Sequence, residues 1–121
     1  MENHKDKVSL GRTGEEAAVR YLKSKRYTII DRRFRFLRGE IDIIAYDRET
    51  LVFAEVKSRS SRAFGFPEES VTPAKQAQIR KIARCYLARH RLEAMPCRFD
   101  VISVEMADGR PSSIRHIENA F

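Results

Sequence analysis

Residues 39–57, GEIDIIAYDRETLVFAEVK, constrain the fold more than any other stretch of this chain. Apolar residues alternate with polar ones on both sides of residues 47–50, DRET. This pattern predicts two strands joined by a four-residue turn. Such a turn sets Tyr46 opposite Leu51 and makes the two strands antiparallel neighbours in a sheet.

The register of this hairpin decides which side chains share a face, because successive residues of a strand point to opposite faces. Asp42 is expected opposite Glu55, and Glu40 opposite Lys57, all on one face. The other face must then be core, with Ile41, Ile43, Ala45, Val52, Ala54 and Val56. Two facing carboxylates repel each other, and a divalent cation between them is the simplest compensation. A slip of one residue would break this arrangement.

The rest of the chain predicts further helices and strands around this hairpin. Thr13 and Glu16 match the capping box, so a helix is expected from Thr13 to about residue 25. Residues 27–36 and the segment after Pro96 read as strands, with a short last strand at 113–117. A loop is expected at residues 58–72. A second helix follows it, capped by Thr72 with Pro73 at its first position.

Glu15 and Glu16 lie on different faces of the first predicted helix. At about 100° per residue, Glu15 shares the apolar side with Val19 and Leu22, whereas Glu16 lines up with exposed basic residues. Burying an unpaired charge costs several kcal/mol or more. Glu15 is therefore either a site residue or a solvated residue at the rim of the apolar stripe, and periodicity leaves both interpretations open.

Length and composition indicate one globular domain. The chain has 121 residues, of which 42% are hydrophobic, enough for a core without disulfides. No apolar run approaches the roughly 20 residues of a membrane span, and the first ten residues lack the apolar core of a signal peptide. Cys85 and Cys97 read as free thiols. We expect a cytoplasmic protein with no membrane segment, a flexible arm at residues 1–10 and a single domain at 11–121.

Basic residues are in excess, 24 Lys and Arg against 17 Asp and Glu, and this favours a polyanionic partner. Phe34 and Phe36 alternate with arginines, a pattern that fits contacts with phosphates and bases, or equally aromatics in the core and arginines in water. The predicted helix at residues 73–90 carries no acid at all. The candidate nucleic-acid-binding residues are Arg32, Arg33, Arg35, Arg38, Arg59, Lys75, Arg80 and Arg84.

The charged residues of the hairpin have the chemistry of phosphodiester hydrolysis. Asp42 and Glu55 are candidate ligands for Mg²⁺ or Mn²⁺, because hard cations prefer carboxylate and carbonyl oxygen. The carbonyl of Val56 would complete the protein ligands. Lys57 would orient or deprotonate the attacking water, and Glu15 would act as an outer ligand.

The pattern resembles the PD-(D/E)xK nuclease superfamily and, in order and spacing, archaeal Holliday-junction resolvases. It is more similar to the YraN-like family of small bacterial proteins over residues 11–104. The matching residues are Gly14-Glu15, Gly39-Glu40-Ile41-Asp42, Val52-Phe53-Ala54-Glu55-Val56-Lys57, Phe64-Gly65, Lys75 and Arg98-Phe99-Asp100-Val101.

The resemblance implies an α/β fold with a restriction-endonuclease-like core, a central mixed sheet of about four or five strands flanked by two main helices. It also implies a catalytic set of Glu15, Asp42, Glu55 and Lys57, with Glu40 as an outer residue. Ile41 stands where the superfamily has proline before the first acid, and both carboxylates are retained.

Three functions compete. The first is a metal-dependent endonuclease acting on nucleic acid, with DNA, including branched DNA, favoured over RNA. The second is a nucleic-acid-binding module of the same fold that has lost turnover. In the third, the charges form ordinary surface salt bridges, which contribute about 0–1 kcal/mol each and need no site. The presence of all four site residues favours the first function. The sequence leaves open whether the protein is a homodimer.

Overall fold

A computed structural model describes residues 4–60 and 65–121, with side chains from residue 11 onward except those of residues 67 and 68. The chain forms α1 (His4–Ser24), β1 (Thr28–Phe36), β2 (Gly39–Asp47), β3 (Thr50–Ser60), η1 (Pro67–Ser70), α2 (Pro73–Arg89), β4 (Cys97–Ala107) and β5 (Arg110–Ile117). Phe64, which contributes to the family resemblance, lies outside the described residues.

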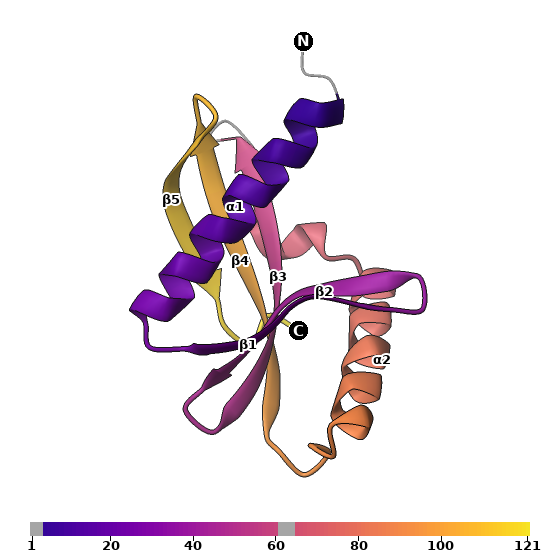
Figure 1. Ribbon diagram of the computed structural model, residues 1–121. Coiled ribbons are helices and arrows are strands. Elements are labelled where there is room, and N and C mark those ends of the chain that lie inside the picture. Colours follow the sequence, from indigo (N-terminus) through magenta and orange to yellow (C-terminus); the bar gives the residue numbers. More distant parts are fainter. Residues whose placement is uncertain (1–3, 61–64) are drawn as a thin grey trace.

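The five strands form one mixed sheet in the order β1-β2-β3-β4-β5 (Figure 1). β3 and β4 are parallel, and the other neighbouring pairs are antiparallel. Parallel neighbours need a crossover connection, and α2 supplies it between β3 and β4. The predicted α/β fold, with a mixed sheet and two main helices, is confirmed.

Each face of the sheet buries its own core against one helix. Ala18 and Leu22 of α1 pack with Ile43, Val52 and other residues on one side. On the opposite side, Ile79, Ile82 and Tyr86 of α2 pack with a second set of strand residues, among them Ile44, Leu51, Phe53 and Val101. The central strands are therefore apolar on both faces, and charged groups among them stand out as exceptions.

The predicted hairpin turn is confirmed, with Tyr46 opposite Leu51, but the pairing of β2 with β3 ends at Ile43 and Ala54. Beyond that point β2 stays paired with β1, where Arg35 lies opposite Glu40. The sequence predicted that six apolar residues of the hairpin share one core face, and this is wrong for Ile41, which packs in the α2 core. The other five, Ile43, Ala45, Val52, Ala54 and Val56, lie in or against the α1 core. Glu40 likewise does not pair with Lys57.

The first helix starts earlier than its capping signal predicts. α1 begins at His4, so Thr13 lies inside the helix and is not its N-cap. No proline interrupts residues 4–12, and Gly11 alone costs only about 0.5–1 kcal/mol in a helix, so the helix continues toward the N-terminus. Residues 4–10, expected in a flexible arm, are helical backbone, and residues 1–3 lie outside the described residues.

Other boundaries shift by a few residues. β3 extends to Ser60, into the predicted loop, because its pairing with β4 continues to Met106. β5 begins at Arg110 rather than residue 113. The predicted cap of α2 is confirmed, since Thr72 Oγ1 accepts a hydrogen bond from Lys75 N at 3.2 Å. Among the described helices, none is both long and apolar enough to span a membrane.

Candidate active site

Charged side chains from four elements gather where β2 departs from β3. α1 contributes Glu15, β2 contributes Asp42, β3 contributes Glu55 and Lys57, and α2 contributes Lys75. Four of these positions were predicted as catalytic. Lys75 was predicted only to bind nucleic acid, yet its Nζ lies 3.6 Å from Glu55 Oε2. Lys75 lies in the first turn of α2, and this position in the sequence did not predict a contact with Glu55.

The two carboxylates at the fork are held differently. Asp42 Oδ2 accepts a hydrogen bond from Val56 N at 2.8 Å, in place of the backbone pairing that has ended there. Glu55 is only 4% exposed, and its Oε1 is buried with no hydrogen-bond partner. An unpartnered buried carboxylate oxygen is costly, so this oxygen is a candidate ligand atom.

Burial, with repulsion by nearby negative charge, raises the pKa of both carboxyl groups. Burial raises the pKa of Glu55 to about 7, and repulsion by Asp42 adds to the effect against the attraction of Lys75. Burial likewise raises the pKa of Asp42 to about 6, with Glu15 and Glu40 adding repulsion and the Val56 hydrogen bond opposing it. Each ionised carboxylate is thus destabilised by its surroundings, a condition that functional sites often share.

The two lysines form an unequal pair. Burial lowers the pKa of Lys57, and the hydrogen bond that it accepts from Lys75 lowers it further. For Lys75, burial alone would lower the pKa, but the bond to Lys57 and the attraction of Glu55 raise it on balance. Lys75 therefore holds its proton more firmly than Lys57, so Lys57 is the better candidate of the two to accept a proton from water.

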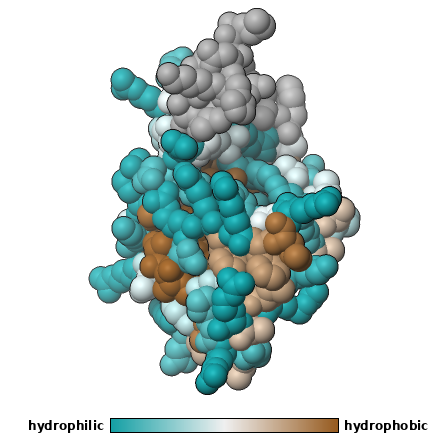
Figure 2. Space-filling view, turned by 45° about the vertical axis from the view of Figure 1, so that its right-hand side comes forward, coloured by the Kyte–Doolittle hydropathy of each residue, from teal (hydrophilic) through white to brown (hydrophobic). Residues whose placement is uncertain are grey.

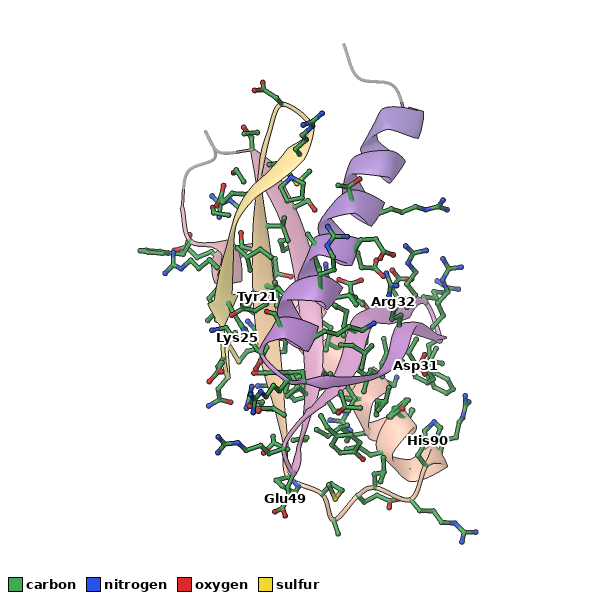
Figure 3. The ribbon with its side chains drawn as sticks, turned by 60° about the vertical axis from the view of Figure 1, so that its left-hand side comes forward. Tyr21, Lys25, Asp31, Arg32, Glu49 and His90 are labelled. Carbon is green, nitrogen blue, oxygen red and sulfur yellow. The ribbon has the colours of Figure 1, made fainter. Side chains whose placement is uncertain are left out.

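Glu15 is buried at the edge of this site and is held by arginines from β1. Arg33 Nε donates to both of its oxygens, at 3.0 and 3.2 Å. Arg32 Nη2 lies 3.4 Å from Glu15 Oε1 and 2.7 Å from Glu16 Oε1, bridging β1 to α1 (Figure 3). Of the two interpretations left open by periodicity, the rim residue is therefore wrong, because Glu15 is buried and paired.

A glycine allows α1 to reach the site. Gly14 is buried against β3, and a Cβ at this position would overlap Ser58 Oγ. Ser58 follows Lys57 directly, so the close approach of helix and strand brings Glu15 beside the other charged groups. A side chain at position 14 would require Ser58 to shift.

The predicted nucleic-acid-binding residues do not form one surface. Arg32 and Arg33 are engaged with Glu15, and Arg59 pairs with Glu105 at 3.8 Å. Arg80 lies over the rings of Phe99 and Phe121, and Arg84 is exposed on α2. Lys75 lies in the site, and Arg38 lines the same groove as Lys75. Arg35 Nε lies 3.1 Å from Glu40 Oε2, so Arg35 and not Lys57 is the partner of Glu40.

Asp42 and Glu55 fit a hard divalent cation as a pair. Across residues 4–60 and 65–121, no group of three or more His, Cys, Asp or Glu side chains could hold a metal ion. Mg²⁺ needs less, since it is commonly bound by one or two carboxylates and keeps several waters. The unpartnered Glu55 Oε1 and the raised pKa values of both groups are what such a cation would relieve.

Comparison with known proteins identifies the family. A profile described as "Uncharacterised protein family UPF0102" matches residues 14–104. A UPF0102 protein of Geotalea uraniireducens is 48% identical over 120 residues, covering 99% of this chain and 94% of its own. Relatives in Symbiobacterium thermophilum (48% over 112 residues, 93% of this chain and 95% of the relative) and Geobacter metallireducens (50% over 113 residues, 93% and 92%) carry the same name. The chain belongs to this family, and the resemblance to YraN-like proteins is confirmed.

Proposed function

We propose that this member of family UPF0102 is a metal-dependent endonuclease that hydrolyses phosphodiester bonds in nucleic acid, with DNA favoured over RNA. One observation carries the proposal. Glu55 keeps a buried, unpartnered carboxylate oxygen next to a second carboxylate and a lysine pair. Leaving that oxygen unpaired costs about 1–3 kcal/mol or more, which favours a ligand at this position over a purely structural role.

Asp42 and Glu55 would hold Mg²⁺ or Mn²⁺, which when bound supplies positive charge to the scissile phosphate and lowers the pKa of a water. Lys57 would hold the attacking water by a hydrogen bond and accept its proton at Nζ. The water oxygen forms a bond to phosphorus as the bond to the leaving oxygen breaks. Lys75 would offset the negative charge that gathers on the phosphate. Glu15, held by Arg33, adds to the electrostatics at Asp42.

A second candidate function is nucleic-acid binding without turnover. It draws support from the ion pair between Lys75 Nζ and Glu55 Oε2, in which a lysine lies where a cation would otherwise balance the carboxylate. In a binding module this pair would persist with nucleic acid bound. In a nuclease, metal and substrate would draw Lys75 from the carboxylate to the phosphate.

Cleavage assays on defined DNA test the proposal. Linear, single-stranded, flapped and four-way DNA would be incubated with Mn²⁺ or EDTA, using wild type, Glu55→Ala, Lys57→Ala and the exposed control Lys23→Ala. We expect wild type and the control to cut only with Mn²⁺, and both site variants to bind DNA without cutting it. Cutting by Lys57→Ala at the wild-type rate would point to a contaminant. If wild type cuts none of these DNA substrates, and none of the same structures made of RNA, the endonuclease proposal fails and the binding module remains.

Metal binding is tested separately by calorimetry with Mn²⁺. Wild type should bind the ion, and Asp42→Ala and Glu55→Ala should bind it at least about tenfold more weakly, since each removes one of two carboxylate ligands. Equal binding by all three proteins would exclude these residues as ligands.

A cytoplasmic location is part of the proposal and is supported by the free thiols of Cys85 and Cys97.

A further inference from the structure

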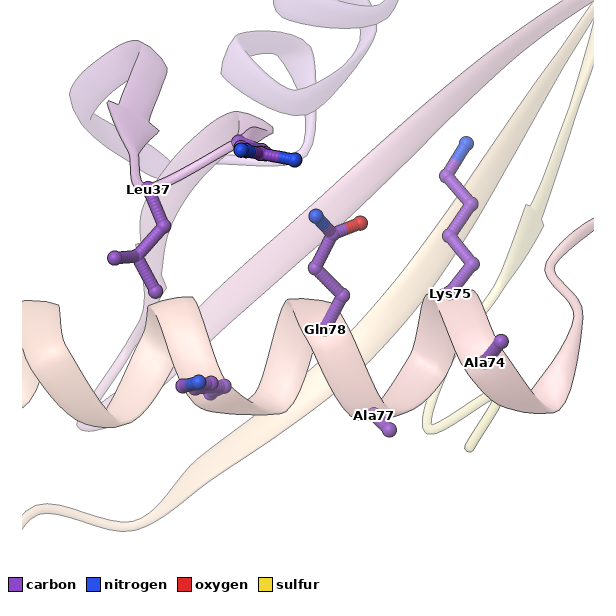
Figure 4. A pocket seen from close by; sticks show the side chains of 7 residues that line it. Leu37, Ala74, Lys75, Ala77 and Gln78 are labelled. Atoms are coloured by element: carbon purple, nitrogen blue, oxygen red, sulfur yellow. The ribbon is translucent and has the colours of Figure 1, made fainter.

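A groove lies beside the site, between the β1–β2 turn and the first half of α2. Its volume is about 750 Å³, and its lining residues are Leu37, Arg38, Ala74, Lys75, Ala77, Gln78 and Lys81. Leu37 hangs from the turn toward the helix, and Lys75 and Gln78 rise from the helix on the same side (Figure 4). Lys75 belongs both to this groove and to the contact with Glu55, so groove and site are continuous.

The charge of the groove matches a polyanion. Three of its seven lining residues are basic and none is acidic. Of the described acidic side chains, none forms an ion pair with Arg38 or Lys81, and both residues are exposed. Lys75 and Lys81 are six residues apart on α2, a rise of about 9 Å, so they would meet different phosphates of one strand. Arg38 faces them from the turn.

The shape and the apolar lining select a single strand over a duplex. A volume of about 750 Å³ is typical of a site that holds one small ligand, so the groove has room for a nucleotide or two. Leu37 is 64% exposed at the rim, and Ala74 and Ala77 add apolar surface. Hydrophobic side chains also interrupt the hydrophilic surface in the view that brings the α2 side forward (Figure 2). Unstacked bases offer apolar faces to such surface, whereas a duplex offers mainly its backbone.

The narrow spacing is built into the fold. A Cβ at Gly39 would lie 2.8 Å from Gln78 Nε2 and 2.8 Å from Ile82 Cδ1, so the turn packs directly against side chains of α2. Leu37 has a φ of 57°, which places its side chain at the tip of a tight turn. The two walls are thus held close by the packing of the turn against the side chains of α2.

We propose that this groove binds a single-stranded segment of the nucleic acid directly next to the scissile phosphate. The substrate class is then a nucleic acid in which a duplex gives way to a single strand, such as an overhang or a flap. This inference rests on the proposed function, because it places the strand by its contact with Lys75 at the same site.

Fluorescence anisotropy in EDTA tests the groove without turnover. The probes are a labelled single-stranded oligodeoxynucleotide, a blunt duplex, and the same duplex with a single-stranded overhang. The variants are Lys81→Glu and Leu37→Ser, and the matched control is Lys23→Glu, the same charge change on α1 over the other face of the sheet. All three positions are exposed, and thermal melting would verify that each variant folds.

Wild type should bind the overhang and the single strand at least about tenfold more tightly than the blunt duplex. Lys81→Glu should remove most of that preference and reduce the slope of log affinity against log salt by about 0.7 or more, while Lys23→Glu should keep the preference. Leu37→Ser should weaken binding of the single strand and leave the affinity for the blunt duplex unchanged. The groove proposal would be overturned if wild type bound the blunt duplex as tightly as the overhang. It would also be overturned if Lys81→Glu and Lys23→Glu lost the preference for the overhang to the same extent.

The two proposals fail in distinguishable ways. If wild type binds the overhang through Lys81 and Leu37 yet cuts nothing with any divalent metal, the groove stands and the endonuclease proposal fails. If Mn²⁺-dependent cutting is lost in Glu55→Ala but Lys81→Glu cuts every substrate as wild type does, the endonuclease stands and the groove fails.

Discussion

Two clusters of buried carboxylates lie in the same sheet, and they are built in opposite ways. At the start of β4, Asp100 is 0% exposed, and its oxygens accept hydrogen bonds from Arg98 Nε at 3.0 Å, His116 Nε2 at 2.7 Å and Asn119 N at 3.0 Å. At the fork of β2 and β3, Glu55 is equally deep in the protein, yet Oε1 has no partner. One acid is fully satisfied and the other is not.

The pKa values of the two clusters diverge accordingly. Burial alone would raise the pKa of Asp100, but the hydrogen bonds from His116 and Arg98 outweigh it and hold the pKa below its usual value. Burial raises the pKa of Glu55 to about 7 without such compensation. The comparison indicates that the Asp100 cluster serves stability by joining β4 to the C-terminal segment. The Glu55 cluster instead leaves one carboxylate oxygen without a partner, and this is the feature on which the proposed metal site rests.

The largest expected effect is at Asp100. Asp100→Ala removes the acceptor of a buried network and leaves Arg98 without it, which should lower the free energy of unfolding by about 3–5 kcal/mol. Urea denaturation would measure the loss, with Glu49→Ala in the exposed β2–β3 turn (Figure 3) as the control. A loss below about 1 kcal/mol would mean that the network adds no more than a surface pair.

The second prediction is a gain in stability instead of a loss. Glu55→Gln removes a charge whose ionised form the fold disfavours. The pKa is raised from 4.5 to about 7, so the free energy of unfolding at pH 7 should rise by up to about 3 kcal/mol, at about 1.4 kcal/mol per pKa unit. Metal-dependent cleavage should disappear in the same variant. Glu93→Gln, an exposed acid between α2 and β4, should change neither quantity. A destabilised Glu55→Gln variant would show that the Lys75 ion pair outweighs the burial of charge.

The third prediction concerns pH. The raised pKa values of Asp42 and Glu55 mean that the folded state binds more protons than the unfolded state between about pH 4 and pH 7. Stability should therefore rise by about 1 kcal/mol or more as pH falls from 8 to about 5. The lowered pKa of Asp100 acts in the other direction. Its contribution is present above the unfolded pKa of about 4 and is lost as pH falls through the folded value.

Thermal melting across this pH range separates the two clusters. The gain in melting temperature between pH 8 and pH 5 should vanish in the Asp42→Asn, Glu55→Gln double variant, and the loss at lower pH should remain. A double variant with the same rise as wild type would assign that rise to other groups.

The smallest expected effect is at the outer edge of the Asp100 network. The Tyr21 hydroxyl lies 3.3 Å from His116 Nδ1, so Tyr21→Phe should cost about 0.5–1.5 kcal/mol, the usual contribution of one hydrogen bond. In a His116→Ala background the hydroxyl has lost this partner, and the same change should cost nothing measurable in urea. An equal cost in both backgrounds would place the effect of Tyr21 in its packing instead.

Local signals predicted the parts of the site that lie on one hairpin. The four-residue turn and the alternation of residues 39–57 were enough to place Tyr46 opposite Leu51, because turn length sets register. The capping signal at Thr13 was misleading for a related reason. A short cap motif competes with continuation of the helix, and only the complete chain decides where the helix begins.

The sequence by itself determined which residue types are present and which of them share a strand or a helix face, including Asp42, Glu55, Lys57 and Glu15. Only the tertiary structure decided that residues 39–42 of β2 do not pair with β3, that Lys75 reaches Glu55, and that Arg32 and Arg33 hold the glutamates of α1. The physical reason is the distance along the chain over which each interaction acts. Periodicity follows from backbone geometry over a few residues, whereas the partner of a buried charge is whichever group the packing of distant elements brings within a few ångströms.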